Sequence, residues 1–370
     1  MSVLSPIFHS FCGMLLRVRM AFLRPPSRPQ DIHTIAFWCP HGVGDFSMLL
    51  PHLANTVRLF SAQSTHIDLY LTSITHELLQ ALDHDILRTP AVSIVIVHTD
   101  YQHNLRNLTL LRHLRKQRYD LIISSYYTSD IVLFPLMLSH FRSYCRFTRN
   151  GILQQNLVPG HSISLDRWNL RLLFASMYLF FERYVKGQSM TVTEVDLSAY
   201  QYLADKQLFL PDGVRRPATL VMYGRYYKAG KSYPLSKYHD FVRLLRAKKL
   251  PFETMTLLLG TNDYQNLSGD NRALLKDIEA CGVKVVVSSS LDTTLTLLRQ
   301  TRYYVGPDGG GTHLALLGKV PTMIVFFDGG VVPSFIIPEQ HAAHALVGTT
   351  LDRISPEEVL AKLEHLVKKG

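Results

Sequence analysis

The sequence has few cysteines, and their positions do not suggest a disulfide framework or a zinc site. Only four occur in 370 residues, Cys12, Cys39, Cys145 and Cys281, and no two form a Cys-x-x-Cys pair. The His-Glu-x-x-His pattern of zinc hydrolases is also absent. We therefore expect a reducing compartment, no dedicated metal ion and no cofactor.

Long apolar runs are missing as well. No stretch reaches the ~18–20 apolar residues of a spanning helix, and the first residues lack the order of a signal peptide, so a cytoplasmic protein is expected. Residues 1–24 nevertheless combine bulky apolar residues with Arg17, Arg19 and Arg24, and a Pro-rich break follows. This segment resembles a basic amphipathic helix that lies on an anionic membrane. A terminal extension that packs on its own protein or frays is the alternative.

Acidic residues are outnumbered, 29 against 39 Lys and Arg, which gives a formal net charge of +10. Such an excess suits polyanions, anionic membranes or phosphorylated small molecules. Zinc-finger spacing, RNP-type aromatic motifs and long basic blocks are all absent, so nucleic acid is not an expected partner.

The length and the order of elements predict two α/β domains, because a single core seldom grows beyond ~250–300 residues. Short apolar strands alternate with helical stretches, as in βαβ units. We expect an extension over residues 1–30, a Rossmann-like domain over 31–213 and a second over 214–370, facing a cleft. The expected strands are His33–Trp38, His66–Thr72, Val92–His98, Asp120–Ser125, Ser143–Phe147, Ala218–Tyr223, Thr254–Gly260, Val283–Val287, Arg302–Val305 and Thr322–Phe327.

Two helices have distinct signatures. Leu165–Val185 is apolar and aromatic but is interrupted by charges, which is typical of a core or domain-interface helix. Ser355–Lys368 begins with Ser-Pro-Glu-Glu, in which Ser355 and Glu358 can form a capping box.

The most informative segment is Val305–Phe327, where a strand ends in Asp308, three glycines, Thr312 and His313 before a short helix. Glycines allow close approach of the backbone, and the N–H groups at a helix start attract anions, so this loop predicts a phosphate cradle. Neither GxxxxGK[ST] nor GxGxxG is present, which disfavours a P-loop kinase and a simple dehydrogenase. A tight turn around Gly309–Gly311 is the alternative interpretation.

A second segment, CPHGVGDFSMLLPHL, places Gly44 and Asp45 directly after the first strand. A carboxylate at the end of a strand can accept a proton from a hydroxyl, but Asp at a helix start also caps free N–H groups. His41 is a rival base.

Together these segments resemble the bacterial heptosyltransferase family. The signature residues are Gly306, Pro307, Asp308, Gly310, His313, Leu314 and Ala315, and Leu317–Pro321 follow as in that family. The resemblance implies a GT-B fold, a nucleotide-sugar donor held by Asp308, Gly309, Gly310, Gly311 and Thr312, a contribution from His313, and Asp45 as general base beside Gly44.

The resemblance extends to the start of the second domain. Tyr223-Gly224-Arg225 is followed by Lys228, Lys231, Tyr233 and Pro234, where the family has a lysine before Trp-Pro. This implies that Lys231 stabilises the departing diphosphate. More weakly, it places Ser288–Asp292, including Leu291, near the nucleotide base.

The expected activity is therefore inverting transfer of a sugar, with ADP-heptose the leading donor, onto a glycan or glycolipid acceptor such as a lipopolysaccharide core. Epimerisation or hydrolysis of a sugar nucleotide on the same fold is one alternative. Non-catalytic binding of a sugar nucleotide is another.

Overall fold

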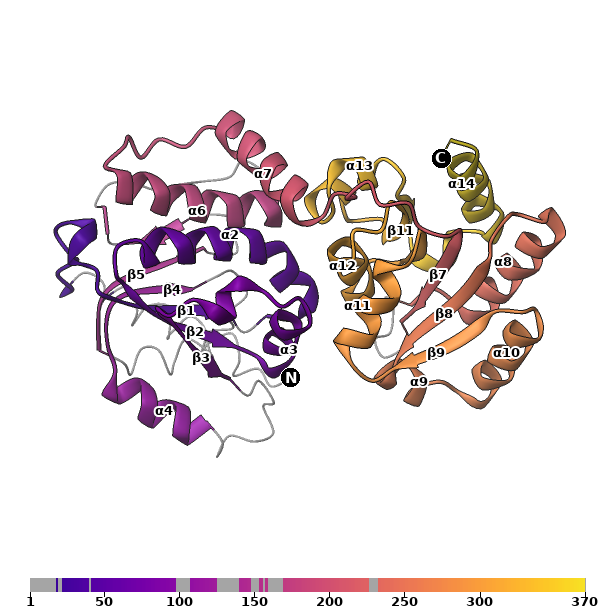
Figure 1. Ribbon diagram of the computed structural model, residues 1–370, viewed down its shortest axis with the longest axis horizontal. Coiled ribbons are helices and arrows are strands. Elements are labelled where there is room, and N and C mark those ends of the chain that lie inside the picture. The colour runs from indigo at the N-terminus through magenta and orange to yellow at the C-terminus, as the bar shows by residue number, and fades with distance from the viewer. Residues whose placement is uncertain are drawn as a thin grey trace. The chain divides into compact units, whose positions relative to one another are not determined.

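The computed structural model describes residues 18, 22–39, 41–97, 107–124, 140–147, 153–155, 157–158, 169–225 and 232–369. The chain forms two compact units, Met1–Ala204 and Asp205–Gly370 (Figure 1). The division falls inside helix α7, Glu194–Leu208, whereas the sequence analysis placed it after residue 213. The first part of this helix belongs to the first unit, where Tyr200 stacks on Tyr178 with ring centroids 4.7 Å apart.

The first unit is built around a six-stranded sheet in the order β3-β2-β1-β4-β5-β6. All pairs are parallel except β5 with β6. Five of the strands lie where the apolar runs predicted them, and β6 was not predicted. The bounds are β1 Thr34–Cys39, β2 His66–Leu71, β3 Val92–Ile96, β4 Arg118–Ser124, β5 His140–Phe147 and β6 Leu153–Gln155.

Helices cover both faces of this sheet. Figure 1 shows α2, α6 and α7 on one side of the sheet and α4 on the other, and α3 contacts α2. Leu114 of α4 packs in a cluster with Trp38, Tyr70 and Tyr144 of the strands. Besides α7, the bounds are η1 Pro29–Asp31, α2 Val43–Ser61, α3 Ser73–Ala81, η2 Asp85–Arg88, α4 Asn107–Lys116 and α6 Leu170–Lys186.

Helix α6 is the aromatic helix that the sequence predicts from residue 165. It begins at Leu170 because the side chain of Asn169 caps it, accepting hydrogen bonds from the N–H groups of Arg171 and Leu172. Its Phe174 and Phe181 are fully buried, which confirms the predicted core role. Each such ring contributes roughly 1.5–3 kcal/mol by leaving water.

The second unit repeats the same topology. Its six strands are all parallel, in the order β12-β11-β10-β7-β8-β9, so that both sheets have the order 3-2-1-4-5-6 of a doubly wound Rossmann fold. The predicted fold class, α/β with two Rossmann-like domains, is confirmed. The bounds are β7 Thr219–Gly224, β8 Thr254–Gly260, β9 Lys284–Ser288, β10 Tyr303–Pro307, β11 Thr322–Asp328 and β12 Leu346–Gly348.

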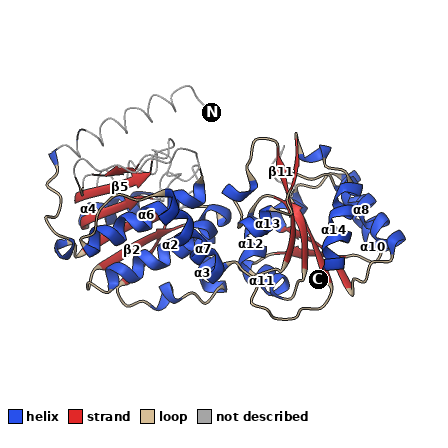
Figure 2. Cartoon of the chain, turned by 90° about the horizontal axis from the view of Figure 1, so that it is seen from above, coloured by secondary structure: helices blue, strands red, loops and turns tan. Residues whose placement is uncertain are grey.

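In this unit Figure 2 shows α8, α10 and α14 on one face of the sheet and α11, α12 and α13 on the other. Helix α14 begins with the predicted capping box: Glu358 N–H donates to Ser355 Oγ at 3.1 Å, and Ser355 N–H donates to Glu358 Oε2 at 2.7 Å. The bounds are α8 Leu235–Lys248, α9 Thr261–Gln265, α10 Gly269–Ala280, α11 Leu291–Arg299, α12 Gly310–Leu317, η3 Pro333–Phe335, α13 Glu339–Ala342, η4 Leu351–Arg353 and α14 Pro356–Lys369.

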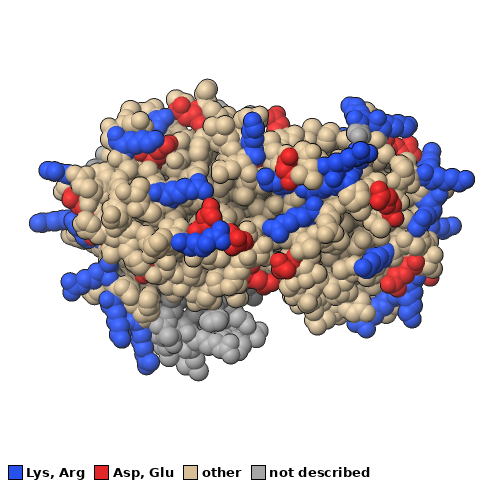
Figure 3. Space-filling view, viewed as in Figure 1, with Lys and Arg blue, Asp and Glu red and all other residues tan. Residues whose placement is uncertain are grey.

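Surface charge and helix length bear on the expected partners. Figure 3 shows Lys and Arg side chains scattered over the visible face of each unit, with acidic side chains among them. Within the described part of the chain, no helix has both the length and the apolar character that a membrane span requires.

Candidate functional site

Each sheet places candidate residues at its switch point. In a doubly wound sheet, ligands bind beyond the carboxyl ends of the strands where the strand order reverses. That point lies between β1 and β4 in the first unit and between β7 and β10 in the second. His41, Gly44 and Asp45 follow β1, and Asp308–Thr312 follow β10, so topology places both predicted groups at switch points.

In the second unit the glycine loop leads directly into α12. Gly309 is the N-cap, and Gly310, Gly311 and Thr312 form the first turn, which contains no acidic residue. The first N–H groups of a helix have no partner within it, and the helix dipole makes this end positive. The start of α12 is therefore suited to an anion such as a diphosphate.

Two side chains of the β7 end hold this loop and explain two of its glycines. Arg225 is 9% exposed, and its Nη1 donates to the Asp308 carbonyl oxygen at 3.0 Å. A Cβ on Gly309 would lie 2.6 Å from the same Nη1, and a Cβ on Gly311 would lie 2.5 Å from Cδ1 of Tyr223. The aromatic ring is stiff, so Gly311 in particular has no room for a side chain.

The side chain of Thr312 is committed to the loop itself. It is fully buried, its hydroxyl donates to the Pro307 carbonyl oxygen at 2.8 Å, and the Tyr304 hydroxyl lies 3.1 Å from its Oγ1. Burial raises the pKa of Tyr304 well above its usual range, so its hydroxyl keeps its proton and can donate here. Thr312 thus fixes the loop, and its backbone N–H is the part that belongs to the start of α12.

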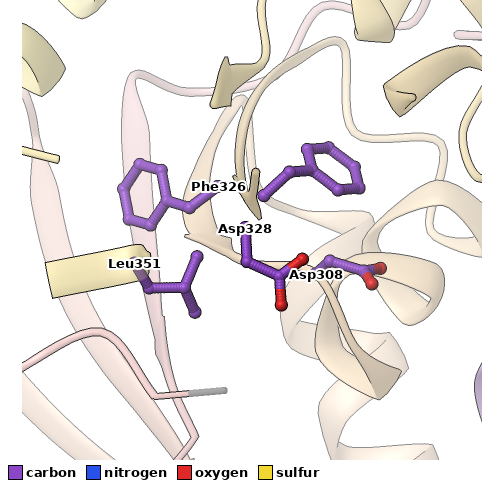
Figure 4. A pocket seen from close by; sticks show the side chains of 5 residues that line it. Asp308, Phe326, Asp328 and Leu351 are labelled. Atoms are coloured by element: carbon purple, nitrogen blue, oxygen red, sulfur yellow. The ribbon is translucent and has the colours of Figure 1, made fainter. Parts of the chain in front are cut away.

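Asp308 and His313 pair beneath the loop. His313 is 3% exposed, and its Nε2 lies 3.7 Å from Asp308 Oδ1. Asp308 Oδ1 is buried and makes no hydrogen bond within the described part of the chain. The carboxylate lines a small, open hollow with Phe326, Phe327, Asp328 and Leu351 (Figure 4).

The remaining residues predicted for the donor do not belong to the glycine loop. Leu291 begins α11 after β9, which is three strands from β10, or roughly 14 Å at ~4.8 Å per strand. Its predicted place near the nucleotide base stays a prediction. Lys231 and Lys228 lie outside the described residues.

In the first unit, the candidate bases differ in access. Asp45 is half-buried in the first turn of α2, after the N-cap Gly42, and Gly44 is also half-buried. His41 is 4% exposed, with its ring edge-on to Phe174 at 6.2 Å between centroids. Burial lowers the pKa of His41 to about 4, so its imidazole is neutral near pH 7. Asp45 is thus the more accessible base of the two.

Sequence reasoning left Arg225, Tyr223 and Asp328 out of the predicted site. Arg225 could have been predicted from its position, because it directly follows the first strand of the second sheet. Tyr223 could not, because its contact with Gly311 depends on how β7 and β10 lie side by side. The sequence could have indicated Asp328, because Asp-Gly-Gly occurs at the carboxyl ends of both β10 and β11.

Comparison with known proteins gives the fold. Searches against models of protein families and against curated sequences find no match. Among solved structures, heptosyltransferase WaaC of E. coli in complex with ADP is 14% identical, with a TM-score of 0.58, over 90% of this chain and 99% of that one. ADP-heptose lipopolysaccharide heptosyltransferase II of E. coli is 14% identical, with a TM-score of 0.53, over 91% and 99%. A family 9 glycosyltransferase of Veillonella parvula is 13% identical, with a TM-score of 0.56, over 91% and 98%. This chain has the fold of these enzymes, as the sequence predicts.

Proposed function

We propose that this chain is a glycosyltransferase that transfers a sugar from a nucleoside diphosphate to an acceptor hydroxyl. The observation that carries the proposal is the start of α12, where the N–H groups of Gly310 and Gly311 and the guanidinium of Arg225 gather positive charge at the switch point of the second sheet. The fold likeness supports the same function, since two structures of WaaC are complexes with ADP and with an ADP-linked fluoroheptose.

The proposed donor is ADP-heptose, and the proposed acceptor is a lipopolysaccharide core or a related glycan. Both rest on the resemblance of the glycine-loop segment to the heptosyltransferase signature. The reaction is proposed to need neither a metal ion nor a cofactor.

The proposed reaction is a single displacement that inverts the configuration at the anomeric carbon of the sugar. The acceptor oxygen forms a bond to the anomeric carbon while the bond from that carbon to the diphosphate oxygen breaks, and the diphosphate leaves with the electron pair. Asp45 accepts the proton of the acceptor hydroxyl. The start of α12, Arg225 and Lys231 stabilise the charge that grows on the leaving group.

We further propose that the enzyme works in the cytoplasm, with residues 1–24 contacting the anionic inner face of a membrane. Arg17, Arg19 and Arg24 would each contribute roughly 1 kcal/mol near such a surface. Deletion of residues 2–24 should reduce co-sedimentation with phosphatidylserine vesicles and leave transfer to a soluble acceptor unchanged. Equal sedimentation of both forms would end this part of the proposal.

Thermal shift with ADP, UDP and GDP tests the donor class. A ligand at a hundred times its Kd stabilises the folded state by about 2.7 kcal/mol, which raises the melting temperature by several degrees. We expect ADP to give the largest shift. A sugar-transfer assay that follows glycosylated acceptor and free sugar separately then tells transfer from hydrolysis. If none of the three nucleotides shifts the melting temperature, the proposed function is wrong.

A further inference from the structure

The sequence Asp-Gly-Gly stands at the carboxyl ends of two neighbouring strands: Asp308-Gly309-Gly310 follows β10, and Asp328, the last residue of β11, is followed by Gly329-Gly330. The strands are parallel, with Pro307 beside Phe326, and the Asp308 N–H donates to the Phe326 carbonyl oxygen at 2.9 Å. The two carboxylates therefore lie at one edge of the sheet. Figure 4 shows them on one side of the hollow, with Phe326 and Leu351 on the other.

This hollow offers hydrogen-bond acceptors and no cation. The residues that line it are the two aspartates, two phenylalanines and Leu351. Asp328 is half-buried, and Asp308 Oδ1, which lies 3.7 Å from Nε2 of His313, makes no hydrogen bond within the described part of the chain. Ionised carboxylates only accept hydrogen bonds, so these groups need a ligand or solvent that donates.

Charge divides the loop into two sides. The Arg225 guanidinium lies against Gly309 and the Asp308 carbonyl, whereas the Asp308 carboxylate lines the hollow with Asp328. A phosphate in the hollow would meet two like charges at close range, which is unfavourable. A polyhydroxy group would instead donate its hydroxyls to the carboxylates, and hydrogen bonds to charged groups are about twice as strong as neutral ones.

We infer that Asp328, together with Asp308, binds hydroxyl groups of the donor sugar and so selects which sugar is transferred. The inference rests on the proposed function, because a diphosphate at the start of α12 brings its attached sugar next to the ends of β10 and β11. Asp328 is the specificity-determining residue in this account, since it is the acidic group that β11 adds to the loop.

Asp328 also belongs to a turn, in which its carbonyl oxygen accepts from Gly330 N–H at 2.8 Å and from Val331 N–H at 3.2 Å. These bonds use the backbone and would survive in Asp328→Asn, which keeps the shape of the side chain and removes its charge. A purely structural role would change binding of all ligands alike, so a comparison of two ligands separates the roles.

Calorimetric titration of the full chain with ADP and with ADP-heptose provides the test. In Asp328→Asn we expect the Kd for ADP-heptose to rise about five- to tenfold, the difference between a hydrogen bond to a charged and to a neutral acceptor, and the Kd for ADP to stay within about twofold. Asp352→Asn is the matched control, because Asp352 is exposed, follows Leu351 directly and does not line the hollow; it should leave both constants unchanged. If Asp328→Asn does not fold, Asp328→Glu takes its place. It should likewise raise the Kd for ADP-heptose more than the Kd for ADP.

Other outcomes overturn the inference. An unchanged Kd for ADP-heptose, or equal losses for ADP and ADP-heptose, would remove Asp328 from sugar recognition. Affinity that EDTA abolishes and Mg²⁺ restores would mean that the two carboxylates hold a cation. If the thermal screen favours uridine nucleotides, UDP and UDP-glucose serve as the pair. If the wild-type chain binds no nucleotide, the proposed function fails as well, whereas wild-type binding with an indifferent Asp328→Asn sinks this inference alone.

Discussion

The loops after β1 and β10 both lie at the switch point of their own sheet, the first after strand 1 and the second after strand 4 of the shared strand order, but their residues suit opposite charges. Helix α2 has Asp45 in its first turn, which complements the helix dipole and makes its start a poor site for an anion. Helix α12 has no acidic residue in its first turn, and Arg225 lies against the loop before it. Topology thus positions both sites, while one or two side chains decide that the first offers a base and the second an anion site.

Removing the carboxylate of the first loop should produce the largest effect. We expect Asp45→Asn to lower kcat about a hundredfold or more, the usual size of a general-base contribution, while calorimetry finds nucleotide binding intact. Steady-state kinetics at saturating donor is the measurement. His41→Gln is the control, and it should retain most of the activity. The reverse result, an active Asp45→Asn and an inactive His41→Gln, would transfer the role of base to the histidine.

The second loop can be damaged through space instead of charge. Gly311→Ala places a methyl group against the ring of Tyr223, so we expect the loop to shift, nucleotide affinity to fall at least about tenfold, and stability to fall by ~1–3 kcal/mol. The double variant Tyr223→Ala with Gly311→Ala gives the methyl group room and should regain part of both losses, as calorimetry and urea unfolding can measure. Binding that stays normal in Gly311→Ala would make the loop a turn and leave the donor site without its main support.

Arg225 adds charge and a hydrogen bond to the same loop. We expect Arg225→Lys to weaken nucleotide binding several-fold, because a lysine keeps the charge but has no planar fork to reach the Asp308 carbonyl. Arg225→Ala should weaken it further, about tenfold, and the difference in affinity between the two variants, which reflects the charge, should shrink at high salt. Similar affinity in the two variants would show that geometry, and not charge, is what this residue supplies.

These contrasts also mark what sequence could predict. The parallel strands were found because buried strands such as β1 and β10 read as apolar runs, and the capping residues Ser355 and Glu358 act through neighbours in the chain. The glycine loop could also be predicted, because its residues are contiguous in the chain. Helix α7 was missed because exposed Val195, Tyr202 and Leu203 blur its amphipathic pattern. The contacts of Tyr223 and Arg225 with the loop join residues more than 80 positions apart, and only the register of β7 on β10 brings them together.

The last and smallest effect concerns acid, to which the first unit should be sensitive. Burial lowers the pKa of His41 to about 4 and that of His52 to about 3, with the charge of Arg171 adding to the effect at His52. His52 lies between the rings of Phe174 and Tyr200. Both histidines take up protons more readily in the unfolded chain. Stability is therefore complete above about pH 6.5 and falls as the pH drops towards 4, by about 2 kcal/mol per histidine at pH 5.

Replacing His52 with Phe keeps a ring of similar size in that place and removes one of the two protonation sites. The stability of His52→Phe relative to wild type should thus be about 2 kcal/mol greater at pH 5 than at pH 8. Urea unfolding followed by tryptophan fluorescence reports on the first unit alone, because both tryptophans of the chain, Trp38 and Trp168, belong to it. His76→Phe, at a half-exposed position of α3, controls for the loss of a histidine and should follow the wild-type curve. Parallel pH curves for wild type and His52→Phe would mean that His52 does not resist protonation in the folded chain, and acid sensitivity would then no longer distinguish the first unit.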